Sequence, residues 1–114
     1  MLSHFDSNAT EGAAADFITK YTEKFGVDTL NQFGASAYDC VYAIFNAMKK
    51  AIDSGKDIPV TISADELCEI LKAEFNGDFS YSGVTGNNIT WEDNGYVSKE
   101  AVKYTLKVAN SAEQ

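Results

Sequence analysis

Hydrophobic residues recur at helical spacing in the first quarter of the chain, and this pattern predicts a helix over about residues 8–25. Its apolar face consists of Phe17, Ile18, Tyr21 and Phe25. Asn8 and Glu11 have the three-residue spacing of a capping box, which would start the helix at Asn8 or shortly after it. Gly26 is expected to end the helix, because glycine is favoured just beyond a helix C-terminus.

A second and longer pattern predicts the central helix, over about residues 34–54. Its main apolar stripe is formed by Tyr38, Val41, Tyr42, Phe45, Met48 and Ile52. The stripe is widened by Ala37, Ile44, Ala47 and Ala51. A helix with so broad an apolar surface is expected to be covered on more than one face. Gly55 is expected to end it.

The third helix, predicted over about residues 63–76, has the clearest start. Ser63 and Glu66 have capping-box spacing, so the side chain of each can accept a hydrogen bond from the backbone N–H of the other. The inward face is predicted to consist of Leu67, Ile70, Leu71 and Phe75. Gly77 is then expected to end the helix.

After Gly77 the hydrophobic period changes to two residues, which is typical of strands. Strands are predicted over about residues 79–82, 87–92, 96–98 and 101–109. Between the second and third of them, Asp93-Asn94-Gly95 contains the Asn-Gly pair that favours a hairpin turn. One side of the last strand is formed by Val102, Tyr104, Leu106 and Val108. The predicted fold class is therefore α/β, with three helices followed by a β-hairpin and a final strand.

The apolar surfaces of the central helix and of the final strand exceed what so small a set of elements can cover. This excess predicts that more protein is needed, either another segment of a parent chain or a partner subunit. We therefore expect self-association of the chain on its own, by dimerisation or by segment exchange.

With 114 residues and 45% hydrophobic content, the chain has the size and composition of one globular domain. Its formal net charge of −8 would repel phosphate backbones and anionic lipids, so nucleic acid and membrane surfaces are not expected partners. No apolar run approaches the roughly 20 residues that span a bilayer. The N-terminal sequence lacks the basic and apolar segments of a signal peptide, so the signal of an exported protein is expected to lie upstream.

The residue pattern predicts no enzyme, no metal centre and no cofactor. His4 is the only histidine and lies in an irregular N-terminal stretch, so a Ser-His-Asp or Cys-His site would depend on it alone. We expect it to be a surface or turn residue. The adjacent acids Asp65-Glu66 and Glu92-Asp93 would point apart, whereas an acid/base pair must converge on its substrate.

Three further residues carry chemistry that needs an interpretation. Cys40 and Cys68 have neither CxxC spacing nor a nearby histidine, which disfavours zinc. Each falls within an apolar helical pattern, so both are predicted to be small buried residues, and a disulfide between them stays open. Asp39 lies in the first turns of the central helix, where the helix dipole favours a carboxylate. The alternative for Asp39 is a polar contact to another lobe or to a ligand.

The glycine-rich sequence SGVTG, at 82–86, invites comparison with a phosphate-binding loop. It lacks the GxxxxGK[ST] arrangement, and the nearest lysines, Lys72 and Lys99, lie outside the loop. A structural turn is therefore predicted. Asp93-Asn94-Gly95 likewise lacks the spaced carboxylates of an EF-hand calcium loop.

Three longer stretches share a pattern with one protein family. They are SHFDSNATEGAAADFITKYTEKFG at 3–26, FGASAYDCVYAIFNAMKKA at 33–51 and YSGVTGNNITWEDNGYVSKEAVKYTLKVAN at 81–110. The second resembles a helix with an AYDAVY core, and the third resembles an ending that contains GVTG and then NGD. In order and spacing the three stretches resemble the C-terminal part of type I periplasmic binding proteins, over nearly the whole chain.

The nearest group in that family is the branched-chain amino-acid-binding type, which serves ABC importers. The resemblance implies the C-terminal part of a longer, two-lobed fold with a ligand cleft between its lobes. It implies an extracytoplasmic protein, periplasmic or a cell-surface lipoprotein, that delivers amino acids or similar small polar solutes to an ABC permease. Because this sequence resembles only the end of such a protein, the chain alone is not expected to bind ligand.

The resemblance also implies which residues contact the ligand. The family often places an aromatic residue facing the cleft just before this helix, and Phe33 occupies that place. Gln32 and Tyr38 are the neighbouring candidates, while ordinary packing at the start of the helix is the alternative for Phe33. The sequence departs from the family at Trp91-Glu92, where Phe-Asp is more usual, and at Cys40, where alanine is common. Free cysteines are unusual in exported proteins, and this departure also fits a cytosolic relative.

Two other functions stay open. The same fold could be a fragment of the ligand-sensing domain of a receptor, which would be accompanied by a membrane helix and a signalling domain. The chain could also be an autonomous small α/β interaction domain with a fortuitous resemblance. The autonomous domain predicts a stable monomer with cooperative unfolding and no exposed apolar patch.

Overall fold

The computed structural model describes residues 2–103, which form three helices and two short antiparallel strand pairs. The helices are α1 (Gly12–Phe25), α2 (Gln32–Asp53) and α3 (Ala64–Phe75). The strands are β1 (Leu2–Ser3), β2 (Thr90–Trp91), β3 (Val97–Ser98) and β4 (Val102–Lys103). The chain therefore has the mixed α/β architecture that the hydrophobic pattern predicts.

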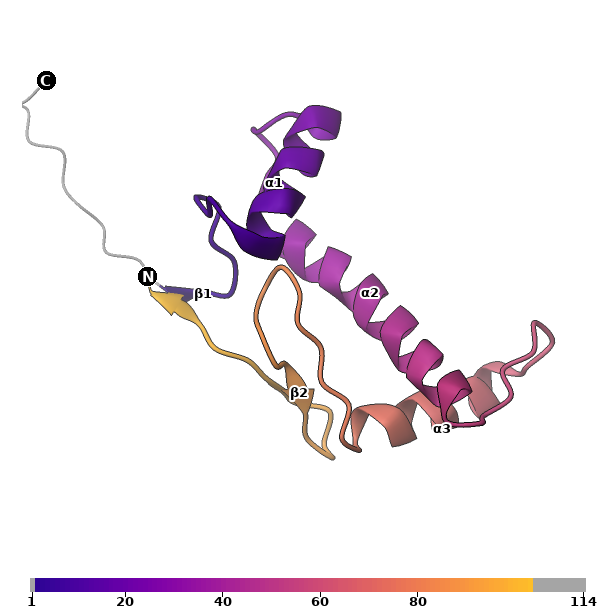
Figure 1. Cartoon of the computed structure of the whole chain (residues 1–114). Helices are drawn as coiled ribbons and strands as arrows, with labels where there is room; N and C mark the ends of the chain where they lie inside the picture. The colour runs from indigo at the N-terminus through magenta and orange to yellow at the C-terminus, as the bar shows by residue number, and fades with distance from the viewer. Residues whose placement is uncertain (1, 104–114) are drawn as a thin grey trace, which may run out of the picture.

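α2 is the longest element, and the others are arranged around it (Figure 1). α1 lies at its N-terminal end and α3 crosses its C-terminal end. The segment 78–89 returns alongside α2 before the chain enters β2. β1 pairs with β4, with Leu2 opposite Lys103 and Ser3 opposite Val102, so the two ends of the described chain lie together.

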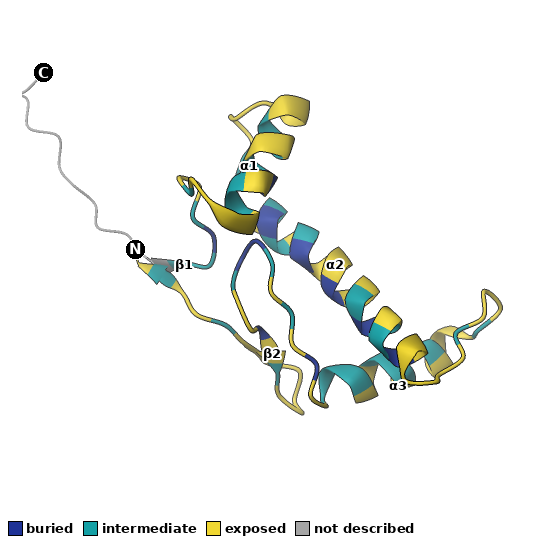
Figure 2. Ribbon diagram, in the orientation of Figure 1, coloured by how far each residue is buried: buried dark blue, intermediate teal, exposed yellow. Residues whose placement is uncertain are grey.

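One face of α2 is buried along the length of the helix and is built almost entirely from small residues. It consists of Ala35, Asp39, Ala43, Ala47 and Ala51, at four-residue intervals. Figure 2 shows this alanine face as dark-blue patches on the side of α2 that faces the segment 78–89. Because alanine side chains are short, the neighbouring backbone can approach the helix closely.

The prediction that the main apolar stripe of α2 is buried is therefore wrong for most of the large residues in that stripe. The exposed ones are Val41, Tyr42, Phe45 and Ile52, and Ile44 from the widening set is exposed as well. Tyr38 and Met48 are half-buried. The hydrophobic pattern favours burial of the largest apolar residues, whereas the neighbours of α2 in this fold leave room only for small ones.

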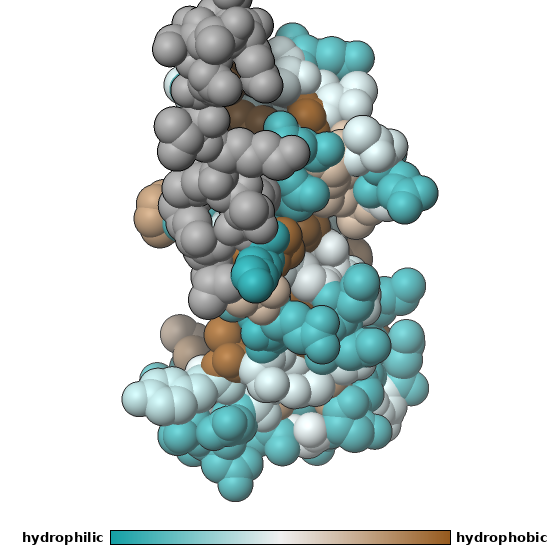
Figure 3. All heavy atoms as spheres, turned by 90° about the vertical axis from the view of Figure 1, so that its left-hand side faces the viewer, coloured by the Kyte–Doolittle hydropathy of each residue, from teal (hydrophilic) through white to brown (hydrophobic). Residues whose placement is uncertain are grey.

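Large apolar residues are also exposed outside α2, in smaller groups. Seen from the side of β1 and β4, the lower half of the molecule is mostly hydrophilic, and apolar atoms show in smaller areas (Figure 3). Exposed large hydrophobic residues outside α2 are Phe25, Val27, Val60, Tyr96 and Val97. Apolar residues that are exposed in ones and twos are ordinary on protein surfaces.

The capping box predicted for α3 is confirmed. Ser63 Oγ accepts a hydrogen bond from the Glu66 N–H at 3.2 Å, and the Glu66 carboxylate accepts from the Ser63 N–H at 3.4 Å. α2 begins earlier than predicted, because Asn31 is its N-cap and accepts a hydrogen bond from the Gly34 N–H at 2.9 Å. Both starts follow the preference for a short polar side chain at the N-cap.

The start predicted for α1 is wrong. The helix begins at Gly12, and its N-cap Glu11 makes no side-chain capping hydrogen bond. The Asn8 N–H donates to Asp6 Oδ1 at 2.9 Å, so Asn8 lies in a turn before the helix and forms no capping box with Glu11. The C-terminal end agrees with the pattern, because Gly26 has a φ of 78° and donates its N–H to the Thr22 carbonyl.

The strands are shorter than predicted. Residues 79–82 pair with 87–92 through a single β-bridge, between Tyr81 and Ile89. Within the second range only β2 is a strand, and it pairs with β3, which lies in the predicted range 96–98. Of the predicted strand 101–109, the structure describes β4, and residues 104–109 lie outside the described part of the chain. In the hairpin the Gly95 N–H donates to the Glu92 carbonyl, and Gly95 rather than Asn94 has positive φ. The loop is therefore the three-residue kind with a left-handed glycine.

Two apolar clusters hold the elements together. Near the N-terminal end of α2, the core is formed by Phe5, Phe17, Ala35 and Val84. Near its C-terminal end, the ring of Phe75 lies 5.2 Å from that of Phe79 and 4.7 Å from that of Trp91. The segment 78–89 contributes Phe79 to one cluster and Val84 to the other, so it is fixed to both halves of the molecule.

Candidate functional site

Phe33 and Gln32, two of the residues implied as ligand contacts, lie at the surface in the first turn of α2. Phe33 is 76% exposed. Gln32 is also exposed, and its Oε1 accepts a hydrogen bond from Ser3 Oγ at 2.9 Å. Their position leaves both side chains accessible to a ligand or to a second lobe.

Tyr38, the third implied contact, belongs to the aromatic packing of the core. Its ring centroid lies 5.0 Å from that of Phe17 and 4.8 Å from that of Tyr42. The hydrogen bond with the Tyr42 hydroxyl, and then burial, raise the pKa of Tyr38 above its usual value. Tyr38 lies five positions after Phe33, which places the two side chains about 140° apart around the helix. The structure does not bring these two side chains to one site.

A buried polar contact joins α2 to the glycine-rich loop at 82–86. Asp39 is 5% exposed, and its carboxylate accepts the backbone N–H of Val84 at 2.9 Å and of Thr85 at 2.7 Å. Asp39 Oδ2 also accepts the Thr85 hydroxyl at 2.6 Å, and Lys99 Nζ donates to Thr85 Oγ1 at 3.0 Å. Both carboxylate oxygens thus have a donor, which offsets the cost of burying the charge. We call this arrangement the Asp39 clamp.

Gly83 is required by the Asp39 clamp for steric reasons. A Cβ at this position would overlap Asp39 Oδ1 and would lie 2.6 Å from Tyr81 Cε1 and 2.8 Å from the Tyr81 hydroxyl. The Gly83 N–H donates to the Gly86 carbonyl at 2.9 Å and closes the turn. The loop is therefore a structural turn, as its sequence predicts, and not a phosphate cradle.

Tyr81 packs beside the same carboxylate. Burial raises the pKa of Tyr81 to about 12, and the negative charge of Asp39 adds to the effect. The hydroxyl of Tyr81 is therefore neutral beside Asp39 over the physiological pH range.

The Asp39 clamp replaces both interpretations that the sequence offered for this residue. Asp39 is the eighth residue of α2, whereas the helix dipole acts mainly within the first turn. Its partners are a loop of the same chain instead of a second lobe or a ligand. Asp39 lies four residues from Ala35 and from Ala43, and this spacing could have shown that Asp39 faces inward with the alanines. No pattern in the sequence marks Thr85 or Lys99 as its neighbours.

The clamp is not arranged for catalysis. The Thr85 hydroxyl donates to Asp39 and accepts from Lys99, so it resembles the hydrogen-bonded centre of a nucleophilic site. Thr85 is, however, among the most deeply buried side chains described. Its geometry fits a role in fixing the loop to the helix.

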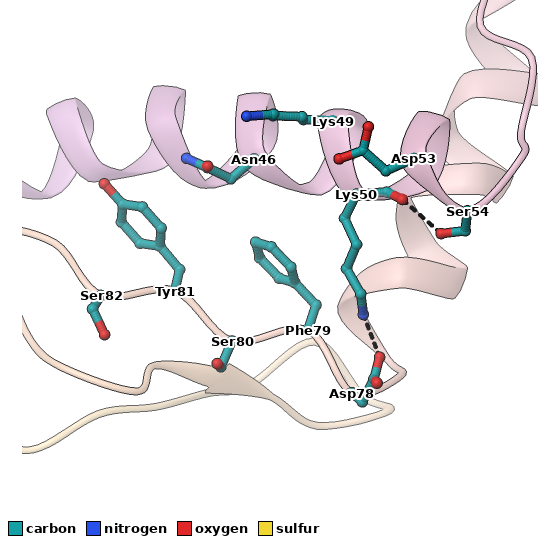
Figure 4. A pocket seen from close by; sticks show the side chains of 10 residues that line it. All are labelled: Asn46, Lys49, Lys50, Asp53, Ser54, Asp78, Phe79, Ser80, Tyr81 and Ser82. Atoms are coloured by element: carbon teal, nitrogen blue, oxygen red, sulfur yellow. Dashed lines mark hydrogen bonds and ion pairs between the residues drawn. The ribbon is translucent and has the colours of Figure 1, made fainter.

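An open hollow of about 790 Å³ lies beside the C-terminal half of α2 (Figure 4). It is lined by Asn46, Lys49, Lys50, Asp53, Ser54, Asp78, Phe79, Ser80, Tyr81 and Ser82. The side chains of Phe79 and Tyr81 point toward α2 and those of Ser80 and Ser82 point away, which is the alternation predicted for residues 79–82.

An ion pair crosses this hollow. Lys50 Nζ donates to Asp78 Oδ1 and lies 3.5 Å from Glu74 Oε2. The hydrogen bond with Asp78 raises the pKa of Lys50, and the same bond lowers the pKa of Asp78. With Lys50 paired in this way, the hollow presents a balanced mixture of charges and favours neither anions nor cations.

A smaller and more apolar groove of about 490 Å³ lies between α2, α3 and the β2–β3 hairpin. It is lined by Cys40, Ala43, Ile44, Lys72, Phe75, Asn76, Trp91, Asp93, Asn94 and Gly95. Cys40 and Cys68 are both free and exposed, so the prediction that they are buried is wrong. Cys40 follows the buried Asp39 by one residue and Cys68 follows the half-buried Leu67, which turns each thiol about 100° away from the inward face.

Metal and membrane features are absent from the part of the chain that the structure describes. Within residues 2–103, no group of three or more His, Cys, Asp or Glu side chains is placed to hold a metal ion. Over the same residues, no helix combines the length and the apolar character needed to cross a membrane. His4 Nδ1 lies 3.1 Å from the Glu100 carbonyl oxygen, near the β1–β4 pair.

No protein-family model matches this chain, and no curated protein sequence or solved structure is significantly similar to it.

Proposed function

We propose that this chain is the C-terminal part of an extracytoplasmic solute-binding protein. In this proposal the parent protein binds amino acids of the branched-chain type, or similar small polar solutes, and delivers them to an ABC permease. The fold would then be the end of a two-lobed type I binding protein. The observation that supports the proposal best is the Asp39 clamp.

The clamp connects two stretches that carry the family resemblance independently. Asp39 belongs to the AYD sequence of the first stretch, and Val84 and Thr85 belong to the GVTG sequence of the second. More than 40 residues apart in the chain, they bind each other through two backbone N–H groups and a hydroxyl. A fortuitous likeness gives no reason for the characteristic residues of both stretches to be partners.

The exposed position of Phe33 fits the same proposal. A cleft between two lobes takes its ligand contacts from both, and closure brings the walls together. Phe33 would supply an apolar contact from this lobe, with Gln32 beside it. The groups that hold the ionic ends of an amino acid would come from the remainder of the parent protein. The role is reversible binding and release, with no covalent chemistry.

One alternative is disfavoured by the structure. An autonomous small interaction domain predicts a surface without a large apolar patch. The outer face of α2 instead exposes several large hydrophobic residues, including Val41 and Phe45.

The test is solute binding by the parent protein that contains this sequence, measured by calorimetric titration with leucine, isoleucine, valine and a set of other amino acids. We expect one amino acid to bind, and Phe33→Ala to weaken its affinity by about tenfold or more, as for a buried aromatic contact. Phe25→Ala is the matched control, because Phe25 is also exposed but lies outside α2. Equal effects of the two substitutions, or tight binding by residues 1–114 alone, would contradict the proposal.

A further inference from the structure

α2 is apolar on two opposite faces, and only one of them is covered along its whole length. The covered one is the alanine face. The other, which we call the outer seam, consists of Tyr38, Val41, Phe45, Met48 and Ile52. On this face Tyr38 is half-buried against Phe17 of α1, and the exposed side chains lie between Val41 and Ile52. At 100° per residue the centre of the outer seam lies about 180° from the centre of the alanine face. A helix that is apolar on both sides is expected to be covered on both.

The spacing of the outer seam is that of a helix-pairing surface. Its residues are separated by three, four, three and four positions, which is the spacing of a and d residues in a heptad. A seam of this kind packs best against a second helix with the same spacing, because the side chains of one helix then fit between those of the other. A second copy of α2 provides such a partner by definition, and a two-fold axis makes the contact self-complementary.

The exposed area of the outer seam is large enough for such a contact. Val41, Phe45 and Ile52 are 68%, 61% and 51% exposed, and Tyr42 and Ile44 flank them. Since a fully exposed large side chain presents roughly 150–250 Å², these five expose on the order of 500 Å². Two copies that cover all five of these side chains, the two flanking ones included, would bury up to about 1,000 Å², which is the lower bound for a specific protein interface.

Charge opposes contact less at this surface than elsewhere on the chain. The chain carries a net charge of −8, so most surfaces of two copies repel each other. Between residues 40 and 52, however, the only charged residues of α2 are Lys49 and Lys50, and Lys50 is paired with Asp78. Two copies that meet at the outer seam therefore bring no carboxylates together along most of the helix.

We propose that the outer seam is the interface of a homodimer, in which α2 of one copy packs against α2 of a second copy. The proposal does not rest on the solute-binding function. The excess of apolar surface predicts either another segment of a parent chain or a partner subunit. The homodimer is the second of these, and it places the partner subunit on one defined face of α2.

The test compares the mass of the 114-residue chain with that of two matched variants, by native mass spectrometry and by light scattering over a dilution series. Val41→Glu places a charge in the outer seam. Val60→Glu makes the same change at a fully exposed position in the connection between α2 and α3. We expect a dimer for the wild-type chain and for Val60→Glu. For Val41→Glu we expect a monomer, or a dissociation constant at least tenfold higher.

Circular dichroism of each variant checks that the helices remain, and Phe45→Glu serves as a second seam variant if Val41→Glu fails to fold. A wild-type monomer at the highest soluble concentration would overturn the proposal. So would a dimer that both seam variants leave intact, because its interface would lie elsewhere. A dimer that appears only after removal of residues 104–114 would show that the chain's own C-terminal segment occupies the seam. Solute binding by the parent protein is a separate measurement, so either proposal can fail while the other stands.

Discussion

Two polar contacts tie the segment 78–85 to α2, and they differ mainly in burial. At one end, Asp39 is buried and accepts hydrogen bonds from Val84 and Thr85. At the other end, Lys50 pairs with Asp78, whose side chain is 93% exposed. Water can replace a lost partner at the exposed pair, but it cannot reach the buried one. Each contact consists of a carboxylate that accepts hydrogen bonds, but the buried one should contribute much more to the free energy of unfolding than the exposed one.

The largest effect is expected from Asp39→Ala. The change leaves the Val84 N–H, the Thr85 N–H and the Thr85 hydroxyl buried without their acceptor, and each orphaned donor costs about 1–3 kcal/mol. We expect a loss of about 3 kcal/mol or more in the free energy of unfolding, measured by urea denaturation. Asp53→Ala, which removes an exposed carboxylate near the end of the same helix, should change the value little. Similar losses for both variants would mean that burial of Asp39 is not what distinguishes the two contacts.

Gly83→Ala tests the same clamp through its shape. The new Cβ would overlap Asp39 Oδ1 and crowd Tyr81, so the loop must move away from the carboxylate. We expect a loss of about 1–3 kcal/mol, the usual range for overpacking, together with faster hydrogen exchange at the Val84 and Thr85 amides.

Gly34→Ala is the matched control for this change. A Cβ on Gly34 meets its nearest neighbouring atom, Asn31 Oδ1, at 3.8 Å, and alanine favours a helix over glycine. The control should therefore be neutral or slightly stabilising. Unchanged amide exchange in Gly83→Ala would show that the clamp tolerates a side chain at this position.

The smallest effect is expected from Lys50→Met, which removes the charge and keeps most of the stem. Because the side chain of Asp78 is 93% exposed and that of Lys50 is 37% exposed, the unfolding midpoint should differ little from that of the wild-type chain, and added salt should reduce the difference further. A loss as large as that of Asp39→Ala would contradict the comparison.

The pH dependence of the Lys50–Asp78 pair has a definite sign. The hydrogen bond with Lys50 lowers the pKa of Asp78 below its ordinary 3.8, so the stabilisation is present above that pH and is lost as the pH falls through the lowered pKa. The pKa of Lys50 is raised above 10.5, so the stabilisation is also lost as the pH rises through that higher value. Asp78→Asn should remove the part of the acid-side dependence that comes from this pair, measured as the difference between the two titrations of stability.

Local signals in the sequence predicted the local structure well. Ser63 and Glu66 lie three residues apart, and their capping box depends on nothing beyond one helical turn. The hairpin glycine and the end of α1 at Gly26 are similar cases. The Asn8–Glu11 pair has the same spacing as the confirmed capping box but fails, since the chain turns at Asp6 before the helix begins.

The parts that the sequence could not reveal depend on residues far apart in the chain. Whether the alanine face or the outer seam of α2 is buried is decided by the segment 78–89, which lies beside the helix only in the folded chain. The contact of Asp39 with Thr85 likewise joins positions 46 residues apart. Hydrophobic period shows that α2 is apolar on more than one side, but it does not show which side the chain itself covers.

The Asp39 clamp also sets an order of events during folding. Asp39 is synthesised well before Val84 and Thr85, the residues whose N–H groups it needs. Until they arrive, packing the alanine face of α2 would bury a carboxylate without donors, at a cost of several kcal/mol. Burial of the alanine face is therefore expected to become favourable only when the glycine-rich loop closes onto Asp39. One acidic side chain thus couples burial of the central helix to a loop more than 40 residues later in the chain.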